Sequence, residues 1–135
     1  MISLNERLFF RSGGVIVIDA AKHAVNTMEK LSPIRVALVT NIPTPYRKPI
    51  YEILVGMPDI DLKVFYCSER EPDREWDLKP TTYEAEFLAE RFFTIGGKFV
   101  HTNPDVFRAL NRFKPDVVIG TGFNPTHLFA FAYAR

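Results

Sequence analysis

The chain has 135 residues, of which 47% are hydrophobic and 24% charged, a composition typical of one globular domain with a hydrophobic core. Its 17 basic residues nearly balance its 16 acidic ones, which excludes the overall positive field that attracts nucleic acid. The single cysteine, Cys67, cannot form an internal disulfide, so we expect a reducing compartment. No apolar run reaches the ~18 residues of a membrane-spanning helix, and we expect a cytoplasmic protein.

Residues 1–33 differ in pattern from the rest of the chain. Val15–Ile18 predicts a short strand, and Asp19 can cap a helix over Ala20–Leu31 that ends at Pro33. Met28 stands shortly before the first strong strand signal. We therefore treat residues 1–33 as an N-terminal extension of doubtful structure, and place the domain at residues 34–135.

From residue 34 onward, strand and helix patterns alternate. We expect strands at 34–40, 62–67, 86–93 and 116–120, a turn at Gly96–Gly97, and helices over about 50–57, from 103 to 114 and from 125 onward. The expected buried faces of the first two helices are Ile50, Ile53, Leu54 and Met57, and Val106, Phe107, Leu110 and Phe113. Such alternation predicts an α/β fold, a Rossmann-like, mostly parallel sheet with helices on both faces. The chain stops within the last helix pattern, so we expect a domain that is incomplete at its C-terminus.

The loop after the first strand of this domain is the leading candidate site, because ligands of parallel sheets bind outside the carboxyl ends of the strands. It offers Asn41, Thr44, Tyr46 and Arg47 at the start of a helix, where N–H groups and a guanidinium favour phosphate or carboxylate. It contains no glycine, so it is not a glycine-rich dinucleotide loop. The alternative is a rigid, proline-bound loop with a hydrated basic pair.

A second candidate loop follows the strand at 116–120. Thr121 and Asn124 offer hydrogen bonds, and the glycine at Gly122 lets a ligand approach the backbone. The alternative is a tight turn with Asn124 as the helix cap, as Asn103 is expected to cap the helix before it.

Weaker candidates lie elsewhere. Trp76, in the charged loop 68–80, can stack on a sugar, and His101 and His127 can act as general bases if they face the cleft, although a structural role is the alternative for each. Asp59 and Asp61 form a D-x-D pattern at the wrong end of a strand. We therefore expect no metal site.

Several segments together resemble the N-terminal domain of family-4 (group 1) glycosyltransferases. The similarity covers about residues 34–135 and rests mainly on the T-N-I-P-T-P-Y-R segment at Thr40–Arg47 and the P-D-V-V-I-G strand at Pro115–Gly120. Two positions depart from the family pattern: Ile42–Pro45 replaces a Gly-Gly loop, and Thr121–Gly122 stands where many relatives carry a histidine. No catalytic residue is transferred.

The resemblance implies the N-terminal half of a GT-B fold, which mainly binds the acceptor. The parent enzyme would move a hexose, with retention, from a nucleotide diphosphate sugar to a glycan or lipid-linked glycan, without a metal or other cofactor. Its partners would be that acceptor, the donor-binding C-terminal domain and, peripherally, the inner face of the membrane. For this chain alone we expect no transferase activity, weak binding of nucleotide sugars, and self-association through surface meant for the missing domain.

Two other classes of protein remain as alternatives. A stand-alone flavodoxin- or receiver-like domain would bind a ligand without catalysis, although a receiver needs acidic residues where Thr40–Asn41 stands. A purely structural interaction domain is the third reading, and a buried first loop would support it.

Overall fold

A computed structural model describes residues 9–11, 15–19, 32–70 and 81–135. The elements in chain order are β1 (Phe9–Arg11), β2 (Val15–Asp19), β3 (Ile34–Thr40), α1 (Lys48–Val55), β4 (Ile60–Tyr66), β5 (Glu84–Phe87), β6 (Phe92–Ile95), β7 (Lys98–His101), α2 (Val106–Phe113), β8 (Val117–Gly120) and α3 (Pro125–Ala134). A six-stranded sheet has the order β1-β2-β8-β3-β4-β5, and β6 and β7 form a separate two-stranded sheet.

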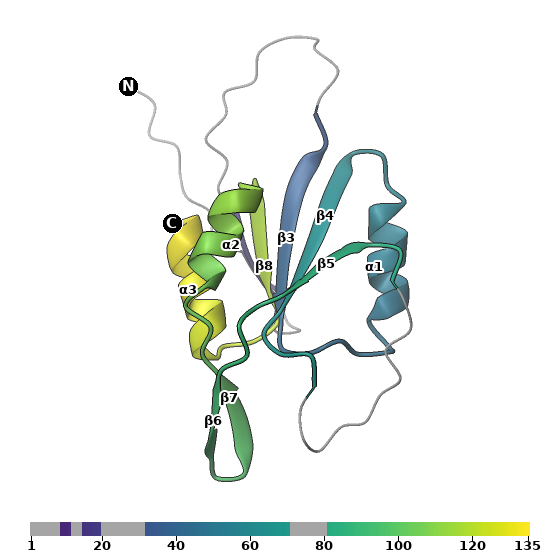
Figure 1. Ribbon diagram of the computed structural model, residues 1–135. Coiled ribbons are helices and arrows are strands. Elements are labelled where there is room, and N and C mark those ends of the chain that lie inside the picture. Colours follow the sequence, from purple (N-terminus) through teal and green to yellow (C-terminus); the bar gives the residue numbers. More distant parts are fainter. Residues whose placement is uncertain (1–8, 12–14, 20–31, 71–80) are drawn as a thin grey trace, which may run out of the picture.

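Four neighbouring strands, β8-β3-β4-β5, run parallel and form the centre of a Rossmann-like α/β fold (Figure 1). From β3 the chain moves outward through β4 to β5, and then returns to β8 on the other side of β3. The direction of winding therefore reverses between β3 and β8. At such a switch point the two loops that leave the strands diverge and open a crevice.

Helices cover both faces of this sheet, as the alternating pattern predicts. On one face, α2 and α3 pack over Ala37, Val39, Phe65 and Val118. On the other face, α1 packs mainly against β4, with Tyr51 set among Leu38, Leu62 and Val64. Successive side chains of a strand point to opposite faces of the sheet. The residues of each strand therefore contribute in turn to the hydrophobic cluster on one face and to that on the other.

The spacing of apolar residues predicts the buried face of α2 better than that of α1. In α2, Val106, Leu110 and Phe113 are buried as expected, while Phe107 is 41% exposed. In α1 the expected stripe holds only at Leu54, which packs against the core partly buried. Ile50 and Ile53 are exposed, as is Met57 just beyond the helix, and Tyr51 is the buried residue. α1 carries apolar residues on most of its sides, so spacing alone does not select the face that meets the sheet.

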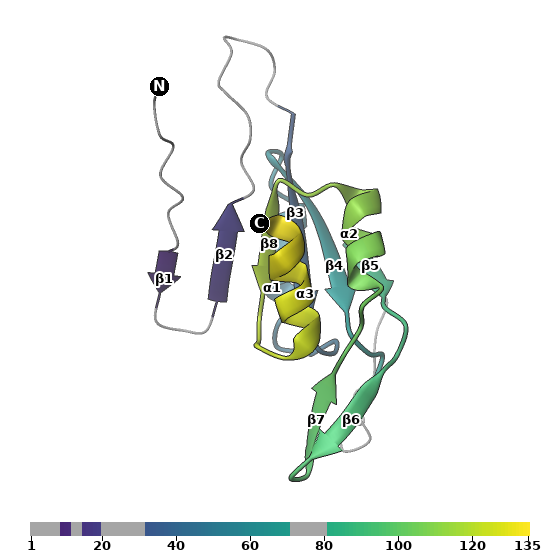
Figure 2. The ribbon, with the colours of Figure 1, turned by 90° about the vertical axis from the view of Figure 1, so that its left-hand side faces the viewer.

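The strand expected at 86–93 is wrong, because the chain there divides between two sheets. β5 ends at Phe87, at the edge of the large sheet, and β6 begins a separate hairpin with β7. The expected turn is present at its tip, where Gly96 and Gly97 have φ of 55° and 77°, angles that favour glycine. The hairpin extends beyond the body of the domain in both views (Figures 1 and 2).

Asn103 does not cap α2, whose N-cap position is Asp105 without a side-chain bond. Its fully buried amide instead donates to the carbonyls of Cys67 and Ala89 and accepts from the Thr126 hydroxyl at 2.8 Å. The Asn103 side chain therefore joins the end of β4, the segment after β5 and α3. Buried polar groups satisfied in this way hold one arrangement of the chain.

The described part of residues 1–33 belongs to the same sheet. β2 confirms the strand expected there and pairs antiparallel with β8, and β1 pairs with β2 (Figure 2). The helix expected over Ala20–Leu31 lies outside the described residues. Among the residues that the structure describes, no helix is long and apolar enough to cross a bilayer.

Candidate functional site

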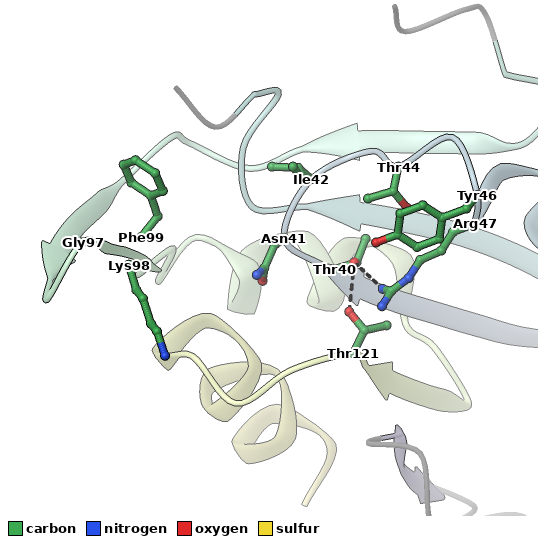
Figure 3. Close-up of a pocket in the computed structure, with 10 residues that line it drawn as sticks. All are labelled: Thr40, Asn41, Ile42, Thr44, Tyr46, Arg47, Gly97, Lys98, Phe99 and Thr121. Atoms are coloured by element: carbon green, nitrogen blue, oxygen red, sulfur yellow. Dashed lines mark hydrogen bonds between the residues drawn. The ribbon is translucent and has the colours of Figure 1, made fainter. Parts of the chain in front are cut away.

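A pocket of about 310 Å³ opens at the switch point, beside the carboxyl ends of β3 and β8 (Figure 3). It is lined by Thr40, Asn41, Ile42, Thr44, Tyr46, Arg47, Gly97, Lys98, Phe99 and Thr121. Its residues come from three separate parts of the chain: the loop after β3, the β6–β7 hairpin and the residue after β8. This is the position at which open α/β sheets bind ligands.

Thr40, the last residue of β3, joins the two loops of the pocket. Its Oγ1 accepts hydrogen bonds from Arg47 Nη1 at 3.1 Å and from the Thr121 hydroxyl at 2.9 Å. The Arg47 guanidinium also lies 5.9 Å from the centre of the Tyr46 ring. Because a guanidinium has five N–H donors, the bond to Thr40 orients Arg47 and leaves other donors for a ligand.

The backbone around Arg47 uses its own donors. The N–H groups of Arg47 and Lys48 both bond to the Thr44 carbonyl, and Pro49 has no N–H to offer. The start of α1 therefore presents fewer N–H groups to an anion than its position suggests. Side chains supply the polar groups instead, among them Thr44 Oγ1, which is buried and has no hydrogen-bond partner among the described residues.

A layer of buried tyrosines supports the pocket from the α1 side. Tyr66 and Tyr83 share a hydrogen bond of 3.0 Å, and the Tyr51 ring meets the Tyr83 ring edge-on at 5.4 Å. Burial raises the pKa of Tyr51, and the nearby Arg47 guanidinium opposes that rise. The pKa of Tyr66 is raised chiefly by burial. These phenols are therefore neutral at physiological pH and act as packing beneath Arg47.

The second loop has a different part in the site. Thr121 lines the pocket, whereas Gly122 and Asn124 are not among its lining residues. Asn124 caps α3 by accepting from the His127 N–H, and its amide donates to Asn41 Oδ1 at 2.7 Å. This hydrogen bond fixes the side chain of Asn41, which lines the pocket.

The glycines of the second loop are explained by packing. A Cβ added at Gly120 would lie 2.5 Å from Phe131 Cζ, and one at Gly122 would lie 3.3 Å from His127 Cε1. Both distances are shorter than an ordinary contact between carbon atoms. A side chain at Gly120 or Gly122 would therefore point toward α3, and the glycines allow that helix to approach the strand end.

His127 is fully buried beneath this loop. Its Nε2 lies 3.1 Å from the Val39 carbonyl oxygen and its Nδ1 lies 2.6 Å from Asn124 Oδ1, and the neutral ring donates to one of these two acceptors. Burial lowers the pKa of His127 to about 4, opposed by the Val39 bond. At physiological pH His127 is therefore neutral and has a structural role, which was the alternative to its prediction as a general base.

The other weaker candidates lie away from the pocket or outside the residues that the structure describes. His101 is fully buried at the base of the hairpin, 6.2 Å from the Phe92 ring, and is not a lining residue. Trp76 lies outside the described residues. Asp61 pairs with Arg35 at the opposite end of the sheet. Within the described residues there is no cluster of His, Cys, Asp or Glu that could hold a metal ion.

Gly97, Lys98 and Phe99 are the pocket residues that the sequence pattern did not single out. They lie at least fifty positions from Arg47 in the chain, and their approach depends on where the hairpin leaves the sheet. The local signal that was present is the Gly96–Gly97 turn followed by a lysine. The sequence does not indicate the direction in which the hairpin extends from the domain.

The chemistry of the pocket is cationic and polar, and its lining includes neither a carboxylate nor a histidine. Its charged residues are Arg47 and Lys98, its neutral polar groups are hydroxyls and an amide, and none of its lining residues is acidic. The chemistry of such a surface suits a phosphorylated or carboxylated, hydroxyl-rich ligand. Comparisons of the chain with protein-family models, curated proteins and solved structures gave no match.

Proposed function

We propose that this chain is the acceptor-side part of a retaining glycosyltransferase, which moves a hexose from a nucleotide diphosphate sugar to a glycan or lipid-linked glycan. The observation that carries the proposal is Arg47, held by Thr40 at the switch point of a Rossmann-like sheet with its other donors facing a pocket. A guanidinium in such a position binds phosphate or carboxylate with defined geometry.

The rest of the pocket suits the sugar part of the ligand. The hydroxyls of Thr40, Thr44 and Thr121 and the amide of Asn41 line it together, and such groups exchange hydrogen bonds with sugar hydroxyls. Tyr46, 62% exposed at the rim, offers an aromatic face. A volume of about 310 Å³ is near the lower end of ligand pockets, so it favours a monosaccharide unit with its phosphate over a whole nucleotide sugar.

The absence of a carboxylate from the ten lining residues supports a binding role for this chain. Carboxylates and histidines are the most frequent general acids and bases, and the titratable residues of this lining, besides Arg47, are Tyr46 and Lys98. In the proposed enzyme, that chemistry and the donor site belong to a second domain, and this chain supplies the acceptor and the stabilising cation.

Isothermal titration calorimetry of the full 135-residue chain tests the proposal with three probes: glucose 1-phosphate, a nucleotide diphosphate glucose and flavin mononucleotide. We expect measurable binding of the sugar phosphate, weaker binding of the nucleotide sugar and none of the flavin. Tighter binding of the nucleotide sugar would make this the donor side of the enzyme. Flavin binding would favour the flavodoxin-like alternative, and no binding of any sugar ligand would remove the transferase proposal.

A further inference from the structure

The side of α1 that faces away from the sheet carries a stripe of exposed apolar residues. The α1 stripe consists of Tyr46, Ile50, Ile53 and Met57, which follow one another at spacings of four, three and four residues, and such spacings place side chains on one side of a helix. Each of the four is between 42% and 64% exposed. Of the described helices, α1 alone lies on this face of the sheet, and Tyr51 on its inner side packs against the strands (Figure 1).

The turns that flank α1 continue its helical backbone, so the stripe is one continuous surface. Before the helix, the Lys48 N–H bonds to the Thr44 carbonyl, four residues earlier. After it, the Met57 N–H bonds to the Leu54 carbonyl, and Gly56 still has right-handed helical angles. The stripe therefore extends over about three helical turns.

No charged residue interrupts this surface. Between the ends of the stripe the other exposed residues are Pro49 and Gly56, and the charged residues of α1, Lys48 and Glu52, pair with each other at its flank at 3.8 Å. The outward side of α2 is different, because it exposes polar and charged side chains: Arg108, Asn111 and Arg112. A surface helix normally carries such residues on its outward side, so the neutral stripe of α1 is typical of a contact with another protein.

We infer that the α1 stripe pairs with the same stripe of a second copy, the two helices packing antiparallel about a two-fold axis near Ile53. The ends of α1 carry opposite charges, with Lys48 in its first turn and the exposed Asp59 beyond its last. Positions 48 and 59 are equally distant from the centre of such a pair, as are 50 and 57. Each Lys48 therefore meets the partner's Asp59, and each Ile50 meets the partner's Met57.

The charges select this orientation over the parallel one. Within the described ranges, no cation lies within ion-pair distance of Asp59, so its carboxylate is available to a second chain. A parallel pair would place like charges and like ends of the helix dipoles together. A two-fold pair uses the same patch on both copies and closes, so association stops at the dimer.

Two other occupants fit the stripe less well. Helix faces that bind anionic lipid are bordered by lysine and arginine, whereas the acidic Asp59 borders the end of this stripe. Ligand clefts of such sheets open at the carboxyl ends of the strands, and the stripe runs along the face of the sheet instead. A second domain across that cleft would leave the stripe uncovered, so the pairing does not depend on the proposed function.

Sedimentation velocity of the full chain at several concentrations tests the pairing. We expect a reversible monomer–dimer equilibrium with a dissociation constant of about 1–100 µM, because one helix from each copy buries less than the ~1,200 Å² of a standard interface. Ile53→Lys places two like charges near the axis and should raise the dissociation constant at least ~10-fold. Since Ile53 is exposed, the melting temperature of the variant should stay close to that of the wild type.

Leu128→Lys is the matched control, because Leu128 is 54% exposed on α3, which covers the opposite face of the sheet. It should keep the wild-type dissociation constant. A wild-type chain that stays monomeric at concentrations of several hundred micromolar would overturn the inference. Equal association of Ile53→Lys, or growth to species larger than a dimer, would do the same.

A charge exchange tests the antiparallel arrangement. Lys48→Glu should raise the dissociation constant by about 3- to 10-fold at low ionic strength, since it affects two symmetric contacts. Adding Asp59→Lys should restore most of the association, because each contact is formed again with its charges exchanged. Lys48→Glu also loses the pair with Glu52, which the second substitution does not restore. Absence of rescue would exclude the antiparallel pair.

Flotation with vesicles that contain phosphatidylglycerol tests the lipid alternative. We expect the wild-type chain to form dimers without floating. Flotation of a chain that remains monomeric, abolished by Ile53→Lys, would assign the stripe to a membrane surface and overturn the pairing of two copies.

Discussion

The two loops that leave β3 and β8 begin side by side at one edge of the sheet, yet they are used in opposite ways. The loop after β3 sends Thr44 and Arg47 into an open pocket. The loop after β8 packs its backbone against α3, with His127 fully buried beneath it. Two side-chain hydrogen bonds connect them, from the Thr121 hydroxyl to Thr40 Oγ1 at 2.9 Å and from the Asn124 amide to Asn41 Oδ1 at 2.7 Å.

This difference separates binding from stability within one site. In the first loop, Tyr46 is exposed and Arg47 half-buried, so replacing these pocket residues should affect ligand affinity and leave unfolding almost unchanged. Residues of the second loop hold α3 against the strand end, so their replacement should lower the stability of the domain. The four predictions below test that separation.

The largest expected effect concerns the pH dependence of stability through His127. Its pKa is about 4 in the folded chain and near 6.5 when exposed, so between these values the unfolded chain binds a proton that the folded chain does not. Stability should fall as the pH drops from 6.5 to 4, by up to about 3 kcal/mol from this residue. Urea unfolding at neutral pH and at about pH 4.5 measures the loss.

His127→Gln provides the comparison for that measurement. The variant lacks the titrating ring, so its stability should fall less over the same pH interval, whatever its stability at neutral pH. An equally steep fall in the variant would mean that His127 does not carry the effect, and that the burial of this ring is not what lowers its affinity for a proton.

The next effect concerns Gly120, where an added Cβ would meet the Phe131 ring at 2.5 Å. Gly120→Ala should destabilise the domain by roughly 1–3 kcal/mol, because the ring or α3 must move away from the strand. Gly122→Ala, with a nearest distance of 3.3 Å, is the matched control and should cost less. Thermal melting measures both, and an unchanged melting temperature for Gly120→Ala would contradict the packing argument.

In the first loop, Arg47→Ala should lower the affinity for glucose 1-phosphate by at least ~10-fold, about 1.4 kcal/mol, with stability changed by less than ~0.5 kcal/mol. Arg47→Lys keeps the charge but not the two-pronged geometry, so its affinity should be intermediate. Calorimetry and urea unfolding separate the two quantities. Wild-type affinity in Arg47→Ala would exclude this residue from the site.

The smallest effect is expected where the loops meet. Thr121→Val removes the donor to Thr40 Oγ1, and the net loss of one such hydrogen bond is about 0.5–1.5 kcal/mol. Because the bond joins both loops, this loss should divide between a lower melting temperature and a weaker sugar-phosphate affinity. A change confined to stability would place Thr121 with the second loop alone.

Much of the fold could be predicted from local pattern. The apolar run at Ile34–Thr40 matches β3 over its whole length, and Pro125 begins α3 as expected. Alternation of the elements predicts the parallel sheet with helices on both faces. Arg47 and Thr121 were identified because they follow parallel strands, and the structure brings both to one pocket.

The predictions that were wrong share one physical cause. The local sequence pattern does not specify how a segment lies relative to the rest of the fold. Residues 86–93 have strand character, but the pattern does not show that the chain leaves one sheet for another within them. Asn103 has the side chain of a helix cap, yet it bonds to Cys67, Ala89 and Thr126, which are distant in sequence, and so does not cap the helix. Exposure of Ile53 on α1 has the same origin, since Tyr51 on another side of the helix packs over the sheet.

By itself, the amino-acid sequence determined the class of fold and the edge of the sheet at which the pocket lies, because both follow from the order of strands and helices. Only the tertiary structure decided which polar residues face the pocket and which are consumed by packing. Lys98 entered the site, and His127 was buried beneath it, through contacts between segments far apart in the chain. Such contacts depend on how elements lie in space, which periodicity and local propensity do not encode.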